Sequence, residues 1–179
     1  RKRLIVEAQV MNMTNLVYLD SSILPNQSSK NIQHIVISAE KDIRIGHWGT
    51  DLRITYQNVS HPDIIRVPKF SGKAKLFYQN ILFEGALELE MGFEAYFFTK
   101  YYANRYIPAL RSFHIQNEQE IGDYPFVDVY FNAKIGKARL FVRYDHFNSS
   151  FMGSDYYASP SYPAADASFK FGVSWILFN

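Results

Sequence analysis

The sequence predicts an all-β protein, an antiparallel up-and-down transmembrane β-barrel of about eight strands in one domain covering residues 1–179. Three observations lead to this prediction. Apolar and polar residues alternate with period two through several segments, and short connections between these segments alternate with long ones. The chain is also aromatic-rich, with 13 Tyr and 15 Phe, although its mean hydropathy is only -0.19. Strands that face lipid on one side and water on the other have this composition.

The closing run, residues 169–179, shows the alternation most clearly. In an extended strand, Lys170, Gly172 and Ser174 point to one side. The run places Trp175 and Phe178 where an aromatic girdle is expected, as in the last strand of bacterial outer-membrane barrels. The side opposite Lys170 is apolar and contains Phe169, Phe171, Val173, Trp175 and Leu177.

Two hairpins can be aligned residue by residue. In the first, strands at 73–83 and 86–98 flank a turn at Glu84-Gly85. A two-residue turn there pairs Lys75 with Glu94 and Gln79 with Glu90 on the polar side, and Leu76 with Phe93 and Tyr78 with Met91 on the apolar side.

The second hairpin has strands at 127–135 and 138–145 around Gly136-Lys137. Its turn pairs Ile135 with Ala138, Ala133 with Leu140, Phe131 with Val142 and Val129 with Tyr144, which makes one whole face apolar.

Further strands are predicted at 4–19, 32–45 and 51–59, with a short turn at 46–50. Pro, Gly, Asn and Ser mark the long connections, near residues 20–31, 60–72, 99–123 and 148–165. Outer-membrane barrels have short periplasmic turns and long outer loops, so both ends of the chain are expected on the periplasmic side. A soluble β-sandwich or lipocalin-like barrel is the alternative, because periodicity alone does not distinguish the inside from the outside.

A set of residues in the last half of the chain carries a resemblance to a known family. It consists of Tyr124-Pro125, Asp128-Val129, Ala138-Arg139, Tyr144-Asp145-His146, Tyr156-Tyr157, Tyr162-Pro163, Asp166 and the run from Phe169 to Trp175. With these residues, the segment from about 93 to 179 resembles the C-terminal region of the putative porin family of Bacteroidota outer-membrane β-barrel proteins. Members of that family are longer, so the resemblance implies the C-terminal sector of a larger barrel. The alternative is a self-contained eight-stranded barrel, whose interior would be filled by side chains.

The resemblance implies an outer-membrane location and passive passage of small polar solutes. A non-conducting scaffold within an outer-membrane complex is the alternative. Expected partners are membrane lipid, small polar solutes, other outer-membrane subunits and the barrel-assembly machinery, which would read Phe171, Trp175 and Phe178. The candidates for lining the lumen are Lys75, Glu88, Glu90, Glu94, Asp128, Arg139 and Arg143, together with Glu40, Arg44, Arg53, Lys134 and Asp145.

Other function classes have little support in the sequence. The chain has no cysteine, which removes disulfides and thiolate chemistry, and its net charge of +2 with no long basic block argues against nucleic-acid binding. The sequence contains no run of about 18 apolar residues, so no transmembrane helix is predicted. The five His lack metal-ligand spacing, and Ser149 with His146 and Asp145 lies in no nucleophile motif. We therefore expect no metal, no cofactor and no enzymatic activity.

Overall fold

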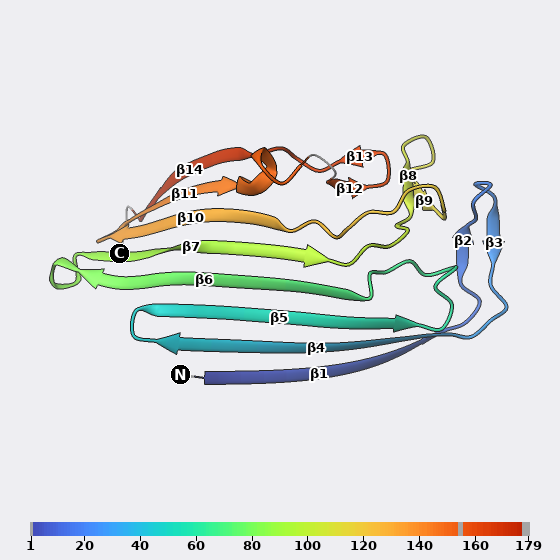
Figure 1. Cartoon of the computed structure of the whole chain (residues 1–179), viewed down its shortest axis with the longest axis horizontal. Helices are drawn as coiled ribbons and strands as arrows, with labels where there is room; N and C mark the ends of the chain where they lie inside the picture. Colours follow the sequence, from blue (N-terminus) through green and yellow to red (C-terminus); the bar gives the residue numbers. More distant parts are fainter. Residues whose placement is uncertain (1, 154–155, 177–179) are drawn as a thin grey trace.

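The computed structural model describes residues 2–153 and 156–176, and it confirms the all-β prediction. Its main feature is an antiparallel sheet of eight long strands, in which each long strand pairs with the next one along the chain (Figure 1). In sheet order the strands are β1 (Lys2–Met13), β4 (Ile32–Ile45), β5 (Trp48–Val59), β6 (Phe70–Leu82), β7 (Leu87–Phe98), β10 (Phe126–Ile135), β11 (Ala138–Asp145) and β14 (Ser168–Trp175).

The sheet is curved and open. Its edges are β1 and β14, and no register joins these two strands within the described residues. The short turns lie together at one end, at the left of Figure 1, where β1 also begins and β14 ends. This arrangement confirms the predicted alternation of short and long connections.

Both predicted hairpin registers are confirmed. Lys75 pairs with Glu94 and Leu76 with Phe93, and in the second hairpin the pairs run from Ile135 with Ala138 to Val129 with Tyr144. The turn between β6 and β7 is longer than predicted, because Leu82 and Leu87 form the last pair of this hairpin and residues 83–86 connect them. A short 3-10 turn, η1 (Phe83–Gly85), fills this connection.

Three strand boundaries were wrong by three residues or more; one of them is the start of β6, which lies at Phe70 and not at residue 73. The first strand ends at Met13 and not at residue 19, because Asn15 adopts a left-handed conformation with φ 56° that an extended strand does not contain. Between β4 and β5, Ile45 pairs with Trp48, so the connection is only Gly46-His47. As a result, β5 begins three residues earlier than predicted.

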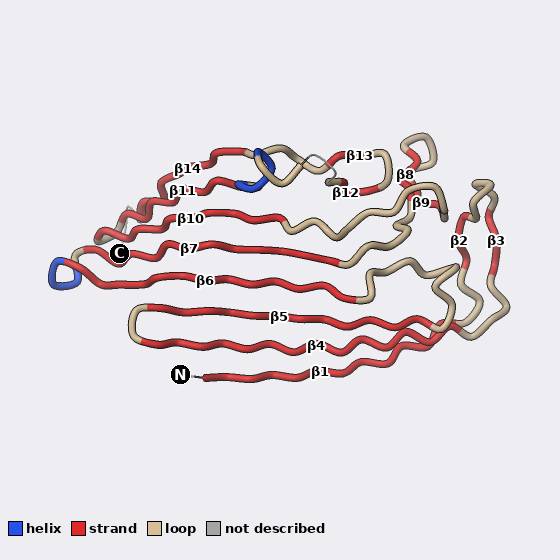
Figure 2. Tube along the Cα trace, viewed as in Figure 1, coloured by secondary structure: helices blue, strands red, loops and turns tan. Residues whose placement is uncertain are grey.

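The long connections contain secondary structure that the sequence did not predict. Four short strands form a separate sheet in the order β3-β2-β9-β8, at the right of Figures 1 and 2. This outer sheet joins segments far apart in the chain through a parallel contact between Leu19 and His114. The short elements are β2 (Val17–Leu19), β3 (Pro25–Gln27), β8 (Arg105–Ile107), β9 (Ser112–His114), the turn η2 (Phe147–Ser150), β12 (Tyr157–Ser159) and β13 (Tyr162–Pro163).

The two faces of the main sheet differ in chemistry. One face, called the apolar face below, leaves large side chains open: Phe171 is 75% exposed and Phe93 is 50% exposed. The opposite polar face carries most of the charged residues of the long strands. Exposed apolar patches larger than a few hundred Å² are typical of protein or membrane contact surfaces. The apolar face of this sheet therefore needs a partner other than water.

Candidate functional site: the polar face

The strand registers place charged residues from distant parts of the chain in one row. Asp128 pairs with Glu94, Glu94 with Lys75, Lys75 with Asp51, and Asp51 with Asp42. Paired residues of antiparallel strands share a face, so this row crosses five neighbouring strands on the polar face. The alternation seen in single strands thus becomes a continuous charged band.

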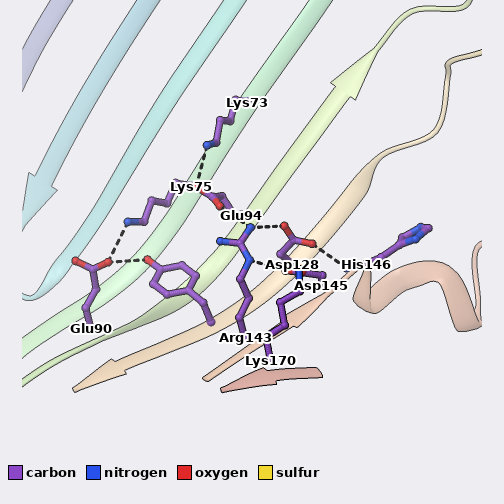
Figure 3. Close-up of polar contacts among 10 residues, drawn as sticks. Lys73, Lys75, Glu90, Glu94, Asp128, Arg143, Asp145, His146 and Lys170 are labelled. Atoms are coloured by element: carbon purple, nitrogen blue, oxygen red, sulfur yellow. Dashed lines mark hydrogen bonds and ion pairs between the residues drawn. The ribbon is translucent and has the colours of Figure 1, made fainter. Parts of the chain in front are cut away.

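Arg143 on β11 is the centre of an ion-pair cluster (Figure 3). Its Nη2 atom lies 3.1 Å from Oε2 of Glu94 and 2.5 Å from Oδ2 of Asp128, and its Nε atom lies 2.5 Å from Oδ1 of Asp145. Lys73 pairs with Glu94 at 3.0 Å, and Lys170 pairs with Asp145. This Arg143 cluster joins five strands and balances three basic with three acidic side chains.

A second group lies toward the turn end of the sheet. Lys75 Nζ is 2.9 Å from Oε1 of Glu90, which also accepts a hydrogen bond from the Tyr130 hydroxyl at 3.1 Å. The same Nζ atom lies 4.9 Å from the ring centroids of Phe77 and Tyr130. The guanidinium carbon of Arg44 also lies over the Phe77 ring, 4.6 Å from its centroid. Cations over aromatic faces are attracted by the ring quadrupole, so these rings and cations hold one another in place.

The ionic partners differ from those that the register suggests. Lys75 is opposite Glu94 in the backbone register, yet its ammonium group pairs with Glu90, while Glu94 binds Lys73 and Arg143. Long side chains lean along the strand, and diagonal neighbours are within their reach. The sequence therefore identified the shared face correctly but not the partners.

Two glycines let aromatic rings lie close to the sheet backbone, and a third lets neighbouring backbones approach. A Cβ atom built on Gly49 would lie 2.4 Å from Cζ of Phe77, and one on Gly172 would lie 2.5 Å from Cε1 of Phe141. At Gly92, which pairs with both Phe77 and Tyr130, a Cβ atom would lie 2.2 Å from the Leu76 carbonyl oxygen. Gly inside a strand often marks such a close approach. Phe77, which lies against Gly49, is only 4% exposed.

The seven main lumen candidates all lie on the polar face. Besides the two groups above, Glu88 pairs with Lys134 at 2.6 Å, whereas Arg139 is exposed and forms no ion pair within the described part of the chain. Of the further candidates, Arg53 pairs with Glu40 and Arg44 with Asp51. Their role in lining a lumen stays a prediction.

Sequence reasoning missed two cations of the Arg143 cluster. Lys73 lies two residues from Lys75, and Lys170 occupies the polar side of the closing strand, so the period-two pattern contained a signal for both. What the pattern lacked was their distance to Glu94 and Asp145, which depends on side-chain direction.

His146 anchors the last long connection over the polar face. Its side chain is 4% exposed, with Nδ1 2.8 Å from the Ala165 carbonyl oxygen and Nε2 2.9 Å from the Tyr124 hydroxyl. Its backbone N–H donates to Asp128 of the Arg143 cluster at 2.8 Å (Figure 3). A cavity of about 500 Å³ separates the far part of this connection, at Tyr157, from polar-face residues of β5 to β7.

Aromatic packing completes this anchor. The ring centroid of Tyr156 lies 4.3 Å from that of His146, and its hydroxyl donates to Oδ1 of Asp166 at 2.7 Å. This hydrogen bond and burial raise the pKa of Tyr156, and burial raises the pKa of Tyr124. The connection is thus fixed by a buried polar network and does not rest on a few surface contacts.

The predicted assembly signal is only partly described. Phe171 and Trp175 lie on the apolar face of the edge strand β14 and are largely exposed. Phe178 lies outside the described residues. The role of these residues in assembly stays a prediction.

Within residues 2–153 and 156–176, no three His, Asp or Glu side chains come together as metal ligands. The same part of the chain contains no helix with the length and apolarity needed to cross a membrane.

Comparison with known proteins gives one result. A family model described as "Putative porin" matches residues 1–179. The likeness therefore extends beyond the segment from about residue 93 to 179 and includes the first half of the chain. Neither a curated protein nor a solved structure matches the chain. The match extends over every strand of the eight-stranded sheet, and on this basis the chain belongs to the putative porin family.

Proposed function

We propose that this chain forms the wall of an outer-membrane β-barrel that lets small polar solutes pass passively. One observation carries the proposal: a single curved sheet has an exposed apolar face and, on its other side, a face of linked charges. The wall of a water-filled pore in lipid needs both of these surfaces. Membership of the putative porin family supports the same proposal.

In this proposal the apolar face contacts lipid and the polar face lines the water path. The short turns lie on the periplasmic side, and the outer sheet faces the outside. The Arg143 cluster then lies in the wall of the water path. Because it contains equal numbers of acidic and basic groups, we expect selection by size and polarity more than by the sign of charge.

A closed ring of eight strands has an interior just wide enough to be filled by side chains. The edges β1 and β14 are not joined in the described residues, and Arg139 and Glu88 on the polar face are exposed to solvent. We therefore propose that the sheet is a sector of a larger ring, in which other strands pair with both edges. The intact mass of the mature protein isolated from outer membranes tests this, because a mass of about 20.8 kDa would contradict a larger single-chain ring.

Planar-bilayer recording tests the pore directly. Purified protein that keeps its heat-resistant fold in detergent is expected to give reproducible unitary current steps. Silence from protein that has been shown to be folded would contradict the pore.

The second candidate is a non-conducting scaffold that binds a partner outside the membrane. The outer sheet favours this function, because Val17, Leu24 and Phe113 of this region are more than half exposed. Chemical cross-linking in intact cells distinguishes the candidates: a scaffold gives a stoichiometric partner linked through this region, and a pore does not require one.

A further inference from the structure

A second part of the polar face has a different character from the Arg143 cluster. A cavity of about 510 Å³ opens near the turn end of β6, β7, β10 and β11, and shares no residue with that cluster. Its volume is within the range of about 300–1,000 Å³ that is usual for small-molecule sites. The side chains used in the argument below are Gln79, Glu88, Asn132, Lys134, Arg139 and Phe141.

Phe141 is the unusual residue of this cavity. Its ring lies against the backbone at Gly172, where an added Cβ atom would meet Cε1 at 2.5 Å and Cζ at 2.7 Å. The side chain is nevertheless 46% exposed, in contrast to Phe77 and Tyr130 on the same face. An open aromatic surface is unfavourable in water. Phe141 is thus a fixed, flat and uncovered platform in a polar wall.

The groups around the platform are polar and largely unpaired. The side chains of Gln79, Asn132 and Arg139 form no hydrogen bond or ion pair with the described residues, although Glu88 and Lys134 pair with each other at 2.6 Å. An amide offers both donors and acceptors, and a guanidinium offers several donors. These groups are free to bind a ligand that both donates and accepts hydrogen bonds.

The charge around the cavity is balanced. Glu88 and Glu90 face Lys134 and Arg139, so neither an anion nor a cation has a clear advantage. A sugar has both properties that the remaining groups require. Its ring presents C–H bonds with partial positive charge, which are attracted by the negative face of an aromatic ring, and its hydroxyls donate and accept at the rim.

We infer that this cavity is a binding subsite for a neutral carbohydrate, with Phe141 as the stacking platform and Gln79, Asn132 and Arg139 as hydroxyl-binding groups. The inference rests on the proposed function, because it names the class of solute that passes along this wall. The subsite lies at the turn end of the proposed water path, and the Arg143 cluster lies farther from the turns.

The test measures sugar binding without requiring conduction. Folded protein in lauryldimethylamine oxide, a detergent without a sugar headgroup, is titrated with glucose, maltotriose, cellobiose and mannobiose, and binding is followed by saturation-transfer NMR. We expect at least one of these sugars to bind. Phe141→Ala is expected to weaken its binding at least tenfold, while Phe141→Trp keeps it. Tyr96→Ala, which removes an exposed aromatic ring elsewhere on the polar face, is the matched control and is expected to leave binding unchanged.

A second pair of variants covers the case in which Phe141→Ala does not fold. Gln79→Ala and Asn132→Ala remove exposed side chains that bind nothing in the described residues, and each is expected to weaken sugar binding severalfold. The inference is overturned if none of the four sugars binds. It is also overturned if folded Phe141→Ala, or both Gln79→Ala and Asn132→Ala, bind sugar as tightly as the unchanged protein does. Unitary currents without sugar binding contradict the subsite alone, whereas sugar binding without currents contradicts the pore alone.

Discussion

Arg143 on β11 reaches across β10 and places its Nη2 atom 3.1 Å from Oε2 of Glu94 on β7. On the way, the same nitrogen contacts Asp128 of β10 at 2.5 Å. A side chain that spans an intervening strand braces the sheet transversely and sets opposite charges side by side in the proposed water path. Such partly exposed pairs contribute only about 0–1 kcal/mol each, so we expect the cluster to matter more for transport than for folding.

The first prediction concerns Glu94. Glu94→Gln keeps the shape of the side chain but leaves Arg143 and Lys73 with one acidic partner fewer. The variant is expected to fold, and the reversal potential in a salt gradient is expected to shift toward anion preference. Glu118→Gln is the control, because Glu118 pairs with Arg105 in an outer connection and its side chain is 74% exposed. Equal shifts in the two variants would remove Glu94 from the conducting path.

The second prediction compares two neighbours at the same depth of the sheet. Phe131 lies on the apolar face, and Asn132 lies on the polar face opposite Glu90. Phe131→Arg is expected to destabilise the barrel in lipid by about 2–4 kcal/mol, because it places a charge in the bilayer. Asn132→Arg is expected to cost far less. Urea titrations of protein folded into lipid vesicles measure both, and similar losses would contradict the assignment of faces.

The third prediction concerns the contact between Gly49 and Phe77. Gly49→Ala places a methyl group 2.4 Å from Phe77 Cζ, so the ring must move out of its position under Arg44. Overpacking of this kind costs about 1–3 kcal/mol. Gly72→Ala is the control, because its nearest contact is the Arg53 carbonyl oxygen at an ordinary 3.6 Å. The loss at Gly49 should be largely reversed in the double variant with Phe77→Leu; if it persists, the close contact is not its cause.

The fourth prediction concerns the anchor of the last connection. Asn148 is 1% exposed, accepts from the Val127 N–H at 2.9 Å and donates to the Pro125 carbonyl at 2.7 Å. Asn148→Ala leaves both backbone groups without this partner, at a cost of about 1–3 kcal/mol. We expect faster proteolysis within residues 146–167 of folded protein. The control is Ser150→Ala at an exposed position of the same turn; identical cleavage rates would show that Asn148 does not anchor this segment.

The fifth prediction concerns assembly. Trp175→Ala combined with Phe171→Ala removes two exposed aromatic side chains from the edge strand β14. If the assembly machinery reads them, the variant accumulates in the periplasm. Ser174→Ala, on the opposite face of the same strand, is the control. Normal protection and surface exposure of the double variant, measured by protease shaving of intact cells, would contradict the assembly role.

The long strands and their hairpins were predictable because two independent signals agreed. In the Gly136-Lys137 hairpin, alternation assigned the faces and the turn fixed the register, so every predicted pair is present. The outer sheet had no such signal: its strands are three residues long, and the contact between Leu19 and His114 joins segments about 95 residues apart. Periodicity needs longer segments, and distant pairing leaves no local pattern.

The polar face was predictable as a set but not as a network. Period-two spacing placed Lys75, Glu90 and Glu94 on one face, yet the choice of Glu90 as the partner of Lys75 depends on how the side chains lean across a twisted sheet. The anchoring role of His146 was not predictable either. It depends on Ala165 and Tyr124, which approach it only after the last connection folds back.

The most direct test of the account asks which face of β10 meets lipid. Because the chain has no cysteine, Phe131→Cys and Asn132→Cys each carry a single spin label after reaction with a nitroxide reagent. In vesicles, oxygen is concentrated in the bilayer and a nickel chelate in water, so paramagnetic relaxation reports the surroundings of each label. The account predicts that the label at 131 is relaxed mainly by oxygen and the label at 132 mainly by the nickel chelate; the reverse pattern, or equal access to both reagents, would contradict it.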